Sequence, residues 1–217
     1  MTMKKTLLVA AVALSALFAG TAMAADGPSL SYNIAATNNY VWRGVSQTMN
    51  NAALQGGVDY KNGSFYAGAW ASNVDFGPST ADTELDLYLG VAPTVGNWSF
   101  DFGAIYYSYP NQCDACDFNV GELKGAVNHT MGKGSVGFAM YLPMEKLEDP
   151  YYEVNASYPI TDKWSVSGAM GNYESAGYRT WNIGASYALT SNLSLDLRYS
   201  EASKLPKNMY ATIKATF

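Results

Sequence analysis

The 217-residue sequence has little charge and few metal-binding side chains. Charged residues make up 14% of the chain, against roughly 25% in ordinary soluble proteins. It contains only two cysteines and one histidine, which are too few for a Cys/His metal centre. The formal net charge is −5 and no basic cluster is present, which argues against nucleic acid as a partner.

Long hydrophobic runs are also missing, apart from a short one at the start. Two lysines (Lys4, Lys5) precede an apolar stretch from Leu7 to Ala19, and Ala22-Met23-Ala24 supplies the small residues of a cleavage site. This order is typical of a secretory signal peptide, here residues 1–24, cleaved after Ala24 or one residue later. The alternative, an uncleaved membrane anchor, is disfavoured because the run is short. Residues 25–217 then form one exported domain.

The exported part shows repeated alternation of apolar and polar residues. In the segment 193–200, Leu193, Leu195 and Leu197 share one face, whereas Asp196 and Arg198 share the other. About twelve such segments of roughly 9–12 residues fit the chain, which is the length of a strand crossing a bilayer at a tilt. Their expected starts are Leu30, Leu54, Ser64, Thr83, Trp98, Phe118, Gly134, Tyr151, Trp164, Arg179, Leu193 and Asn208. Because no exported segment is long enough for a membrane helix, any crossing must be made by strands.

The connections between these segments alternate in length. Five are short turns, such as KNGS at 61–64 and MGKG at 131–134, and six are longer and polar. This rhythm is expected of a barrel with both chain ends on the short-turn side. We therefore predict an all-β fold, a transmembrane antiparallel up-and-down β-barrel of about twelve strands. A soluble periplasmic barrel or sandwich shares the alternation but explains neither the rhythm nor the scarcity of charge.

Aromatic residues gather near the ends of the expected strands. Trp98 and Trp164 follow short turns, and Phe217 ends the chain on the same side. Four others border the long loops, namely Trp42, Tyr109, Tyr151 and Trp181. We expect two aromatic girdles at the water–lipid interfaces. Phe217 also resembles the terminal aromatic residue that the barrel-assembly machinery of outer membranes recognises, so we interpret it as an assembly signal.

One motif near the start of the exported part carries a family resemblance. The run YVWRGVSQT, residues 40–48, is followed by ALQGGVDY and SFYAGAWASNV. The segment from Tyr40 to Val74 resembles the TorF-like porin family of Gram-negative outer membranes. The specific core of the motif is Trp42, Arg43 and Gly44, followed by Ser46 and Gln47. The resemblance implies an outer-membrane location and a pore, but no substrate.

The polar faces of such a barrel would line a lumen. The residues expected to point inward are Asp59, Glu84, Asp86, Asp101, Glu122, Glu153 and Asp196, with Lys124, Arg198, Lys214 and Arg43 as the bases. This excess of carboxylates predicts a weak preference for cations. Alternatively, the charges pair across strands without selectivity, and Asp196 and Arg198 are natural cross-strand partners. Inward tyrosines can also fill the path, namely Tyr88, Tyr107, Tyr141 and Tyr210.

Arg43 has two open interpretations. Its guanidinium could reach into the lumen and bind an anionic group in fork geometry, with Ser46, Gln47 and Asn50 as neutral neighbours. The interpretation we favour is that Arg43 lies at the outer rim or pairs with an acid of the lumen.

The CDAC sequence places Cys113 and Cys116 in the third long loop, beside Asp114 and Asp117. Outside the cytoplasm we expect a disulfide that pins the tip of this loop. Redox or metal chemistry at this spacing needs a helix terminus or further ligands, so weak metal capture is the alternative.

The lone His129 bears on enzymatic activity. Twelve-stranded outer-membrane phospholipases use a serine and a histidine on the lipid face, but His129 has no serine two residues on and lies near a short turn. A nucleophile pair needs contact and an orienting third group. We therefore predict no catalytic residue, no cofactor, no metal and no enzyme.

Taken together, these features predict an outer-membrane porin for passive diffusion of small polar or ionic solutes, with a weak preference for cations. The alternative is a structural or interaction barrel with a plugged lumen that acts through acidic outer loops. The expected partners are outer-membrane lipid and lipopolysaccharide, the barrel-assembly machinery and small polar solutes, and not nucleic acid.

Overall fold

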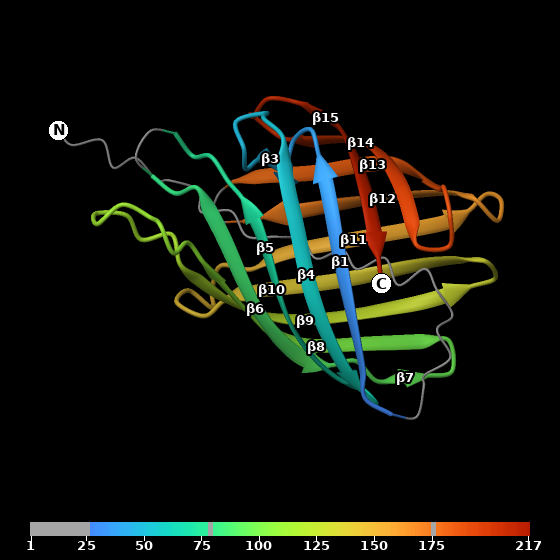
Figure 1. Ribbon diagram of the computed structural model, residues 1–217. Coiled ribbons are helices and arrows are strands. Elements are labelled where there is room, and N and C mark those ends of the chain that lie inside the picture. Colours follow the sequence, from blue (N-terminus) through green and yellow to red (C-terminus); the bar gives the residue numbers. More distant parts are fainter. Residues whose placement is uncertain (1–26, 78–79, 175–176) are drawn as a thin grey trace.

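The computed structural model describes residues 27–77, 80–174 and 177–217, and the expected signal peptide lies outside these ranges. Twelve long antiparallel strands form a closed barrel (Figure 1). They are β1 (Ser29–Thr37), β4 (Ala53–Asn62), β5 (Phe65–Asn73), β6 (Thr83–Val91), β8 (Trp98–Ser108), β9 (Val120–Met131), β10 (Gly134–Pro143), β11 (Tyr151–Pro159), β12 (Trp164–Tyr173), β13 (Tyr178–Ala188), β14 (Leu193–Ala202) and β15 (Asn208–Thr216). No helix in the described part of the chain is long and apolar enough to cross a membrane.

The barrel closes where the first strand meets the last. β1 pairs antiparallel with β15, from Asn33 opposite Thr216 to Thr37 opposite Thr212 (Figure 1, blue beside red). The other strands pair with their neighbours in sequence. Each long strand begins within two residues of its expected start. The prediction of a twelve-stranded antiparallel barrel is therefore confirmed.

Three further strands are only two residues long. β7 (Thr94–Val95) extends the turn before β8. β2 (Val41–Trp42) and β3 (Val45–Ser46) form a separate hairpin within the loop between β1 and β4. The sequence pattern did not predict this hairpin, because its paired segments are too short to show a period of two.

The short turns depend on glycine. Gly63, Gly96 and Gly132 have φ values of 59°, 59° and 60°. This left-handed conformation suits the tight turn of a β-hairpin and is costly for residues with a Cβ atom. These glycines therefore fix the register at the end of the barrel that carries the chain terminus Phe217.

The outer surface of the barrel is apolar and its interior is polar. On β6, Leu87 and Leu89 are 52% and 55% exposed, whereas Glu84 and Asp86 are fully buried. On β1, Leu30, Tyr32 and Ile34 are likewise large and exposed. Apolar surface is unfavourable in water by roughly 25 cal/mol per Å², so this outer face suits lipid. This arrangement is that of a transmembrane barrel, and the soluble alternative is wrong.

The aromatic girdle matches the prediction at the short-turn end but differs in its members at the long-loop end. Trp98, Trp164 and Phe217 are exposed at the short-turn end, as expected. At the long-loop end Trp181 is exposed, but Trp42, Tyr109 and Tyr151 are almost completely buried inside the barrel. The prediction of an outer girdle is therefore wrong for these three residues. Tyr109 and Tyr151 occupy inward positions, and Trp42 belongs to a loop that turns into the lumen.

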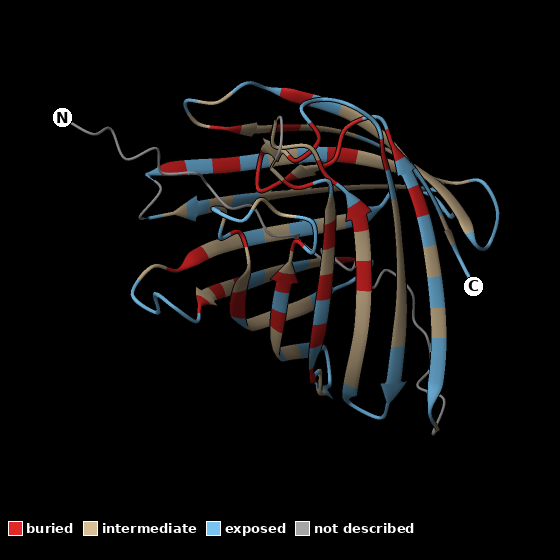
Figure 2. Ribbon diagram, turned by 60° about the vertical axis from the view of Figure 1, so that its left-hand side comes forward, coloured by how far each residue is buried: buried red, intermediate tan, exposed pale blue. Residues whose placement is uncertain are grey.

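Buried residues are concentrated in the long-loop half of the barrel (Figure 2). The main cluster joins loop residues, such as Tyr40 and Trp42, to inward residues of β5, β6 and β8, such as Trp70, Tyr88 and Tyr107. Inward residues of the short-turn half are only partly buried. The lumen is thus filled at one end and accessible to solvent at the other.

Candidate functional site

The loop between β1 and β4, residues 38–52 (loop 1), carries the YVWRGVSQT motif and folds into the lumen. Its hairpin pairs Val41 with Ser46 and Trp42 with Val45. The turn consists of Arg43 and Gly44, with φ values of 42° and 81°. A Cβ atom at Gly44 would lie only 2.8 Å from the Cβ atom of Ala202 on β14. Glycine is therefore required where the tip of the hairpin meets the barrel wall.

Arg43 forms a two-pronged ion pair with Glu122 of β9. Its Nη1 and Nη2 atoms each donate a hydrogen bond of 2.9 Å to one carboxylate oxygen. Both side chains are almost completely buried. The hydroxyl of Tyr107 donates a third hydrogen bond to Glu122, at 3.1 Å. The structure thus matches the favoured interpretation of Arg43, in which it pairs with an acid of the lumen.

Aromatic rings enclose the Arg43 guanidinium. Its central carbon lies 4.1 Å from the ring centre of Trp42, 4.0 Å from that of Tyr151 and 4.8 Å from that of Tyr141. Such contacts attract a cation to the ring faces. Burial acts to lower the pKa of Arg43, but the Glu122 carboxylate outweighs it and raises the pKa above its ordinary value. Arg43 therefore stays charged within a buried aromatic cage.

Further contacts fix loop 1 to both sides of the barrel. The Asn208 amide on β15 donates to the Gly44 carbonyl at 2.9 Å. Three strands around the barrel from β15, the Tyr40 ring packs edge-on against Trp70 of β5, with the ring centres 5.6 Å apart, and Glu122 lies on β9, opposite β15. The Asp75 amide nitrogen, in the next long loop, donates to the Gln47 carbonyl at 2.8 Å. Loop 1 therefore spans the outer half of the lumen from wall to wall.

A second layer of charges lies nearer the short-turn end. Lys124 on β9 pairs with Asp101 on β8 at 2.6 Å. Arg198 pairs with Asp196 at 3.1 Å and also donates to Asn182 on β13. The expectation that Asp196 and Arg198 pair across strands is wrong, because both belong to β14 and point to the same side two positions apart. These side chains are partly exposed, so this layer borders water.

The eleven predicted lumen residues lie on inward strand faces or, for Arg43, in loop 1, and Lys214 is exposed near the short-turn end. Three acids are paired with three bases, as described above. The remaining acids are Asp59, which accepts a hydrogen bond from Tyr88, Glu153, which accepts one from Tyr151, and the buried Glu84 and Asp86. Within the described ranges no salt bridge joins these four carboxylates to a base. After pairing, the inward charges therefore remain acidic, with Lys214 the base left among the predicted set.

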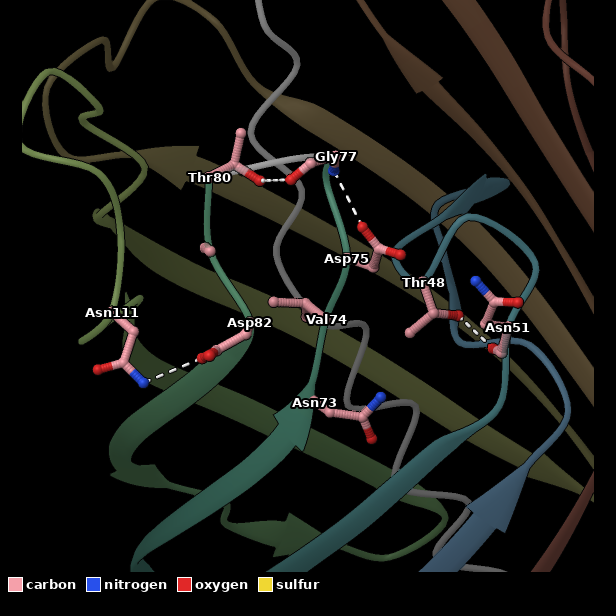
Figure 3. Close-up of a pocket in the computed structure, with 10 residues that line it drawn as sticks. Thr48, Asn51, Asn73, Val74, Asp75, Gly77, Thr80, Asp82 and Asn111 are labelled. Atoms are coloured by element: carbon pink, nitrogen blue, oxygen red, sulfur yellow. Dashed lines mark hydrogen bonds between the residues drawn. The ribbon is translucent and has the colours of Figure 1, made fainter.

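A polar cavity of about 440 Å³ lies among the long loops (Figure 3). Its lining comes from loop 1 and the next two long loops, and includes Thr48, Asn51, Asp75, Asp82 and Asn111. The Asn111 amide donates to the Asp82 carboxylate at 3.0 Å. Hydrogen bonds from Asn111 and Thr83 lower the pKa of Asp82 below its ordinary value. The cavity is a polar vestibule at the outer end of the barrel.

In the structure Cys113 and Cys116 are joined by a disulfide. The Cys116 side chain packs against the buried cluster of the outer half. Asp114 and Asp117 stand beside the bridge, but no group of three or more His, Cys, Asp or Glu side chains in the described part of the chain is arranged to hold a metal ion.

His129 lies near the short-turn end of β9. Its ring stacks on Trp98 with the ring centres 4.2 Å apart, and its Nδ1 atom has no hydrogen-bond partner among the described residues. The contact with an orienting group that a catalytic Ser–His pair needs at this nitrogen is therefore not made.

Sequence reasoning missed the aromatic cage and the inward fold of loop 1. A signal was available, because the segment from Tyr40 to Thr48 has no acidic residue and contains two aromatic side chains and one amide. Such a segment is suited to burial against a polar wall.

A family model described as a bacterial protein of unknown function (Gcw_chp) matches residues 21–216. The chain belongs to the Gcw_chp family. The motif at residues 40–48 lies within the match, and its resemblance to TorF-like porins stays a prediction. No curated protein matches the sequence.

Solved structures of outer-membrane proteins share the fold of this Gcw_chp member. The KdgM porin aligns with a TM-score of 0.63 at 9% identity, over 87% of this chain and 97% of that one. Omp33 of Acinetobacter baumannii aligns with a TM-score of 0.56 at 10% identity, over 87% and 97%. Outer membrane phospholipase A from Escherichia coli aligns with a TM-score of 0.50 at 12% identity, over 87% and 89%. At these identities the similarity shows the fold alone.

Proposed function

We propose that the protein is an outer-membrane channel for the passive diffusion of small polar or ionic solutes. The observation that carries the proposal is a closed barrel whose outer face is apolar and whose interior is lined with charged and polar side chains. Such a lumen offers water and ions a path that lipid does not. The similarity in fold to the KdgM porin supports the same function.

A weak preference for cations is part of this proposal. Three ion pairs neutralise three of the seven inward acids, and Asp59, Glu84, Asp86 and Glu153 remain. Lys214 is the base that stays unmatched among the inward residues considered. Excess carboxylate in a narrow polar path raises the local concentration of cations and lowers that of anions.

Loop 1 would form the narrowest part of the path. Its hairpin crosses the outer half of the lumen, and the buried Arg43–Glu122 pair holds it in place. Solutes entering from the polar vestibule would pass beside this hairpin and then reach the wider, water-accessible half. The width beside loop 1 would thus limit the size of the solute.

A reversal-potential measurement tests the selectivity. The refolded mature protein is placed in a planar bilayer between unequal KCl concentrations, and the zero-current voltage is recorded. We expect a cation-selective sign in the wild type and a smaller voltage in the Asp59→Asn, Glu153→Gln double variant. Glu148→Gln, on a long loop, is the control that should leave the voltage unchanged. An anion-selective wild type would contradict the charge assignment while keeping the channel.

A second candidate function is a closed barrel that acts through its outer loops. The observation in its favour is that loop 1 is fastened to β5, β9, β14 and β15 at once. In that case the folded wild-type barrel passes no current, and acidic loop residues such as Glu145 and Glu148 serve as a contact surface for lipopolysaccharide. Enzymatic activity has no comparable support, since Nδ1 of His129 lacks a partner within the described ranges.

In either case, Phe217 would direct the chain to the barrel-assembly machinery. Its backbone already closes the barrel, since its N–H donates to the Tyr32 carbonyl at 2.9 Å and its carbonyl accepts from the Tyr32 N–H at 3.0 Å. The exposed ring is then available for recognition by the assembly machinery before the barrel closes. After closure it would lie at the lipid interface.

A further inference from the structure

Two buried carboxylates lie together on the inward face of β6 without a base beside them. Glu84 and Asp86 are both fully inaccessible to solvent. They occupy successive inward positions of one strand, whose Cα atoms are about 7 Å apart. Neither belongs to a salt bridge in the described part of the chain. Two uncompensated charges in such a place are unfavourable unless a partner neutralises them.

The oxygen atoms of Asp86 lack hydrogen-bond donors. Both carboxylate oxygens of Asp86 have no partner among the described residues. Glu84 accepts a hydrogen bond from the Tyr109 hydroxyl at 3.1 Å and lies beside the Tyr40 hydroxyl. Buried polar atoms of side chains are nearly always paired, so two unpaired oxygens on one buried carboxylate indicate an additional ligand.

Tyr40 of loop 1 adjoins the same carboxylates. This residue is 5% exposed, and its hydroxyl lies within reach of the Glu84 carboxylate. A cation held between Glu84 and Asp86 would therefore also lie beside a hydroxyl oxygen of loop 1.

The base of loop 1 is not available to neutralise these carboxylates. Arg43, the base of loop 1, is committed to Glu122 through both terminal nitrogens. Protonation is the alternative way to neutralise Asp86, and a barrel neutralised in that way would bind no cation here. A bound cation both neutralises the charges and occupies the free oxygens.

We propose that Glu84 and Asp86 bind one divalent cation of the hard, oxygen-seeking class represented by Ca²⁺, with the Tyr40 hydroxyl as a further ligand. Carboxylate, hydroxyl and water oxygens are the ligands that Ca²⁺ prefers, and its two charges balance the two acids. The cation would reach the site from the polar vestibule, whose lining residues Ala81 and Asp82 precede Glu84 on the same chain segment. By joining Tyr40 of loop 1 to β6, it would also fasten the hairpin to the wall.

Equilibrium dialysis with ⁴⁵Ca²⁺ tests this site. The refolded mature protein is used in detergent, free of lipopolysaccharide, and folding of each variant is checked by heat-modifiable gel migration. We expect the wild type to bind one Ca²⁺ per barrel and Asp86→Asn to bind it roughly tenfold more weakly or not at all. Asp59→Asn is the matched control, because it removes another inward carboxylate and leaves the Glu84–Asp86 pair intact, and it should bind as the wild type does.

The outcomes separate the site from general attraction to an acidic lumen. Folded wild type that binds no Ca²⁺, or Asp86→Asn that binds as well as wild type, would overturn the proposal, as would equal losses in Asp86→Asn and Asp59→Asn. If Asp86→Asn does not fold, the site is tested on the wild type alone. Ca²⁺ should then raise the unfolding temperature of the wild type above its value in NaCl of the same ionic strength, since a ligand stabilises the state that binds it. Equal unfolding temperatures would refute the site. Conduction plays no part in these readouts, so failure of the channel proposal would leave the site standing.

Discussion

Arg43 and Glu122 lie 79 positions apart in the sequence and meet in a two-pronged ion pair inside the barrel. The pair connects the tip of loop 1 to β9 and is sealed by the rings of Trp42, Tyr141 and Tyr151. A buried pair of this kind is expensive to desolvate and still more expensive to break, because the surviving charge has no water. The position of loop 1 therefore depends on both partners.

A double-mutant cycle tests this dependence. Arg43→Met and Glu122→Gln should each lower the free energy of unfolding by about 3–5 kcal/mol, because each leaves a buried partner unsatisfied. The double variant should lose much less than the sum of the two. Urea unfolding of the refolded protein in detergent measures all four free energies, and simple additivity would show that the two side chains act independently.

Gly44→Ala tests the contact between the hairpin tip and β14. The added Cβ atom would lie 2.8 Å from Ala202, and the alanine would have to adopt a φ of 81°. Gly63→Ala is the matched control, with φ of 59° in a short turn and nothing within 4 Å of the new atom. We expect the control to lose about 1 kcal/mol of stability from backbone strain and Gly44→Ala to lose at least twice as much. Equal losses in urea unfolding would mean that the tip does not press on β14.

The disulfide of the third long loop has a direct chemical test. Cys113 and Cys116 are bonded to each other, and the described part of the chain has no free cysteine. A maleimide reagent should therefore fail to label the folded protein until a reductant is added. Immediate labelling without reductant would contradict the bond. A Cys113→Ser, Cys116→Ser variant should still form the barrel, because the bridge spans only one loop tip.

The role of Phe217 can be separated from that of its backbone. Phe217→Ala keeps the backbone hydrogen bonds to Tyr32 but removes the ring, whereas Phe217→Tyr keeps an aromatic ring. We expect a lower yield in the outer membrane for the alanine variant and a normal yield for the tyrosine variant. Both should refold in detergent with normal heat-modifiable migration. A normal membrane yield for Phe217→Ala would show that the ring is not an assembly signal.

The strands could be predicted from the sequence because their information is local. In β14, for example, Leu193, Leu195 and Leu197 alternate with polar residues. Every strand with one face toward lipid and one toward a polar lumen shows this alternation. Turn glycines such as Gly63 and Gly132 then mark where each strand reverses. These signals need only neighbouring residues, which is why each strand start is correct to within two positions.

The interior of the outer half could not be predicted in the same way. The direction of a loop is not encoded by alternation, so Trp42 was assigned to an interface and lies instead against Arg43. The choice of Glu122 as partner depends on strand order and on how far loop 1 reaches across the lumen. The unpaired state of Asp86 follows from the same three-dimensional arrangement. Predicting these features would have required knowing the positions of several strands at once.

The central claim is that the lumen conducts and that loop 1 limits the path. The most direct test compares single-channel conductance in planar bilayers between the wild type and a variant whose residues 41–46 are replaced by Gly-Gly-Ser. We expect small discrete steps for the wild type and clearly larger steps for the variant, with both proteins showing heat-modifiable migration. Equal step sizes would mean that loop 1 does not form the constriction. A folded variant that passes no current would contradict the channel itself.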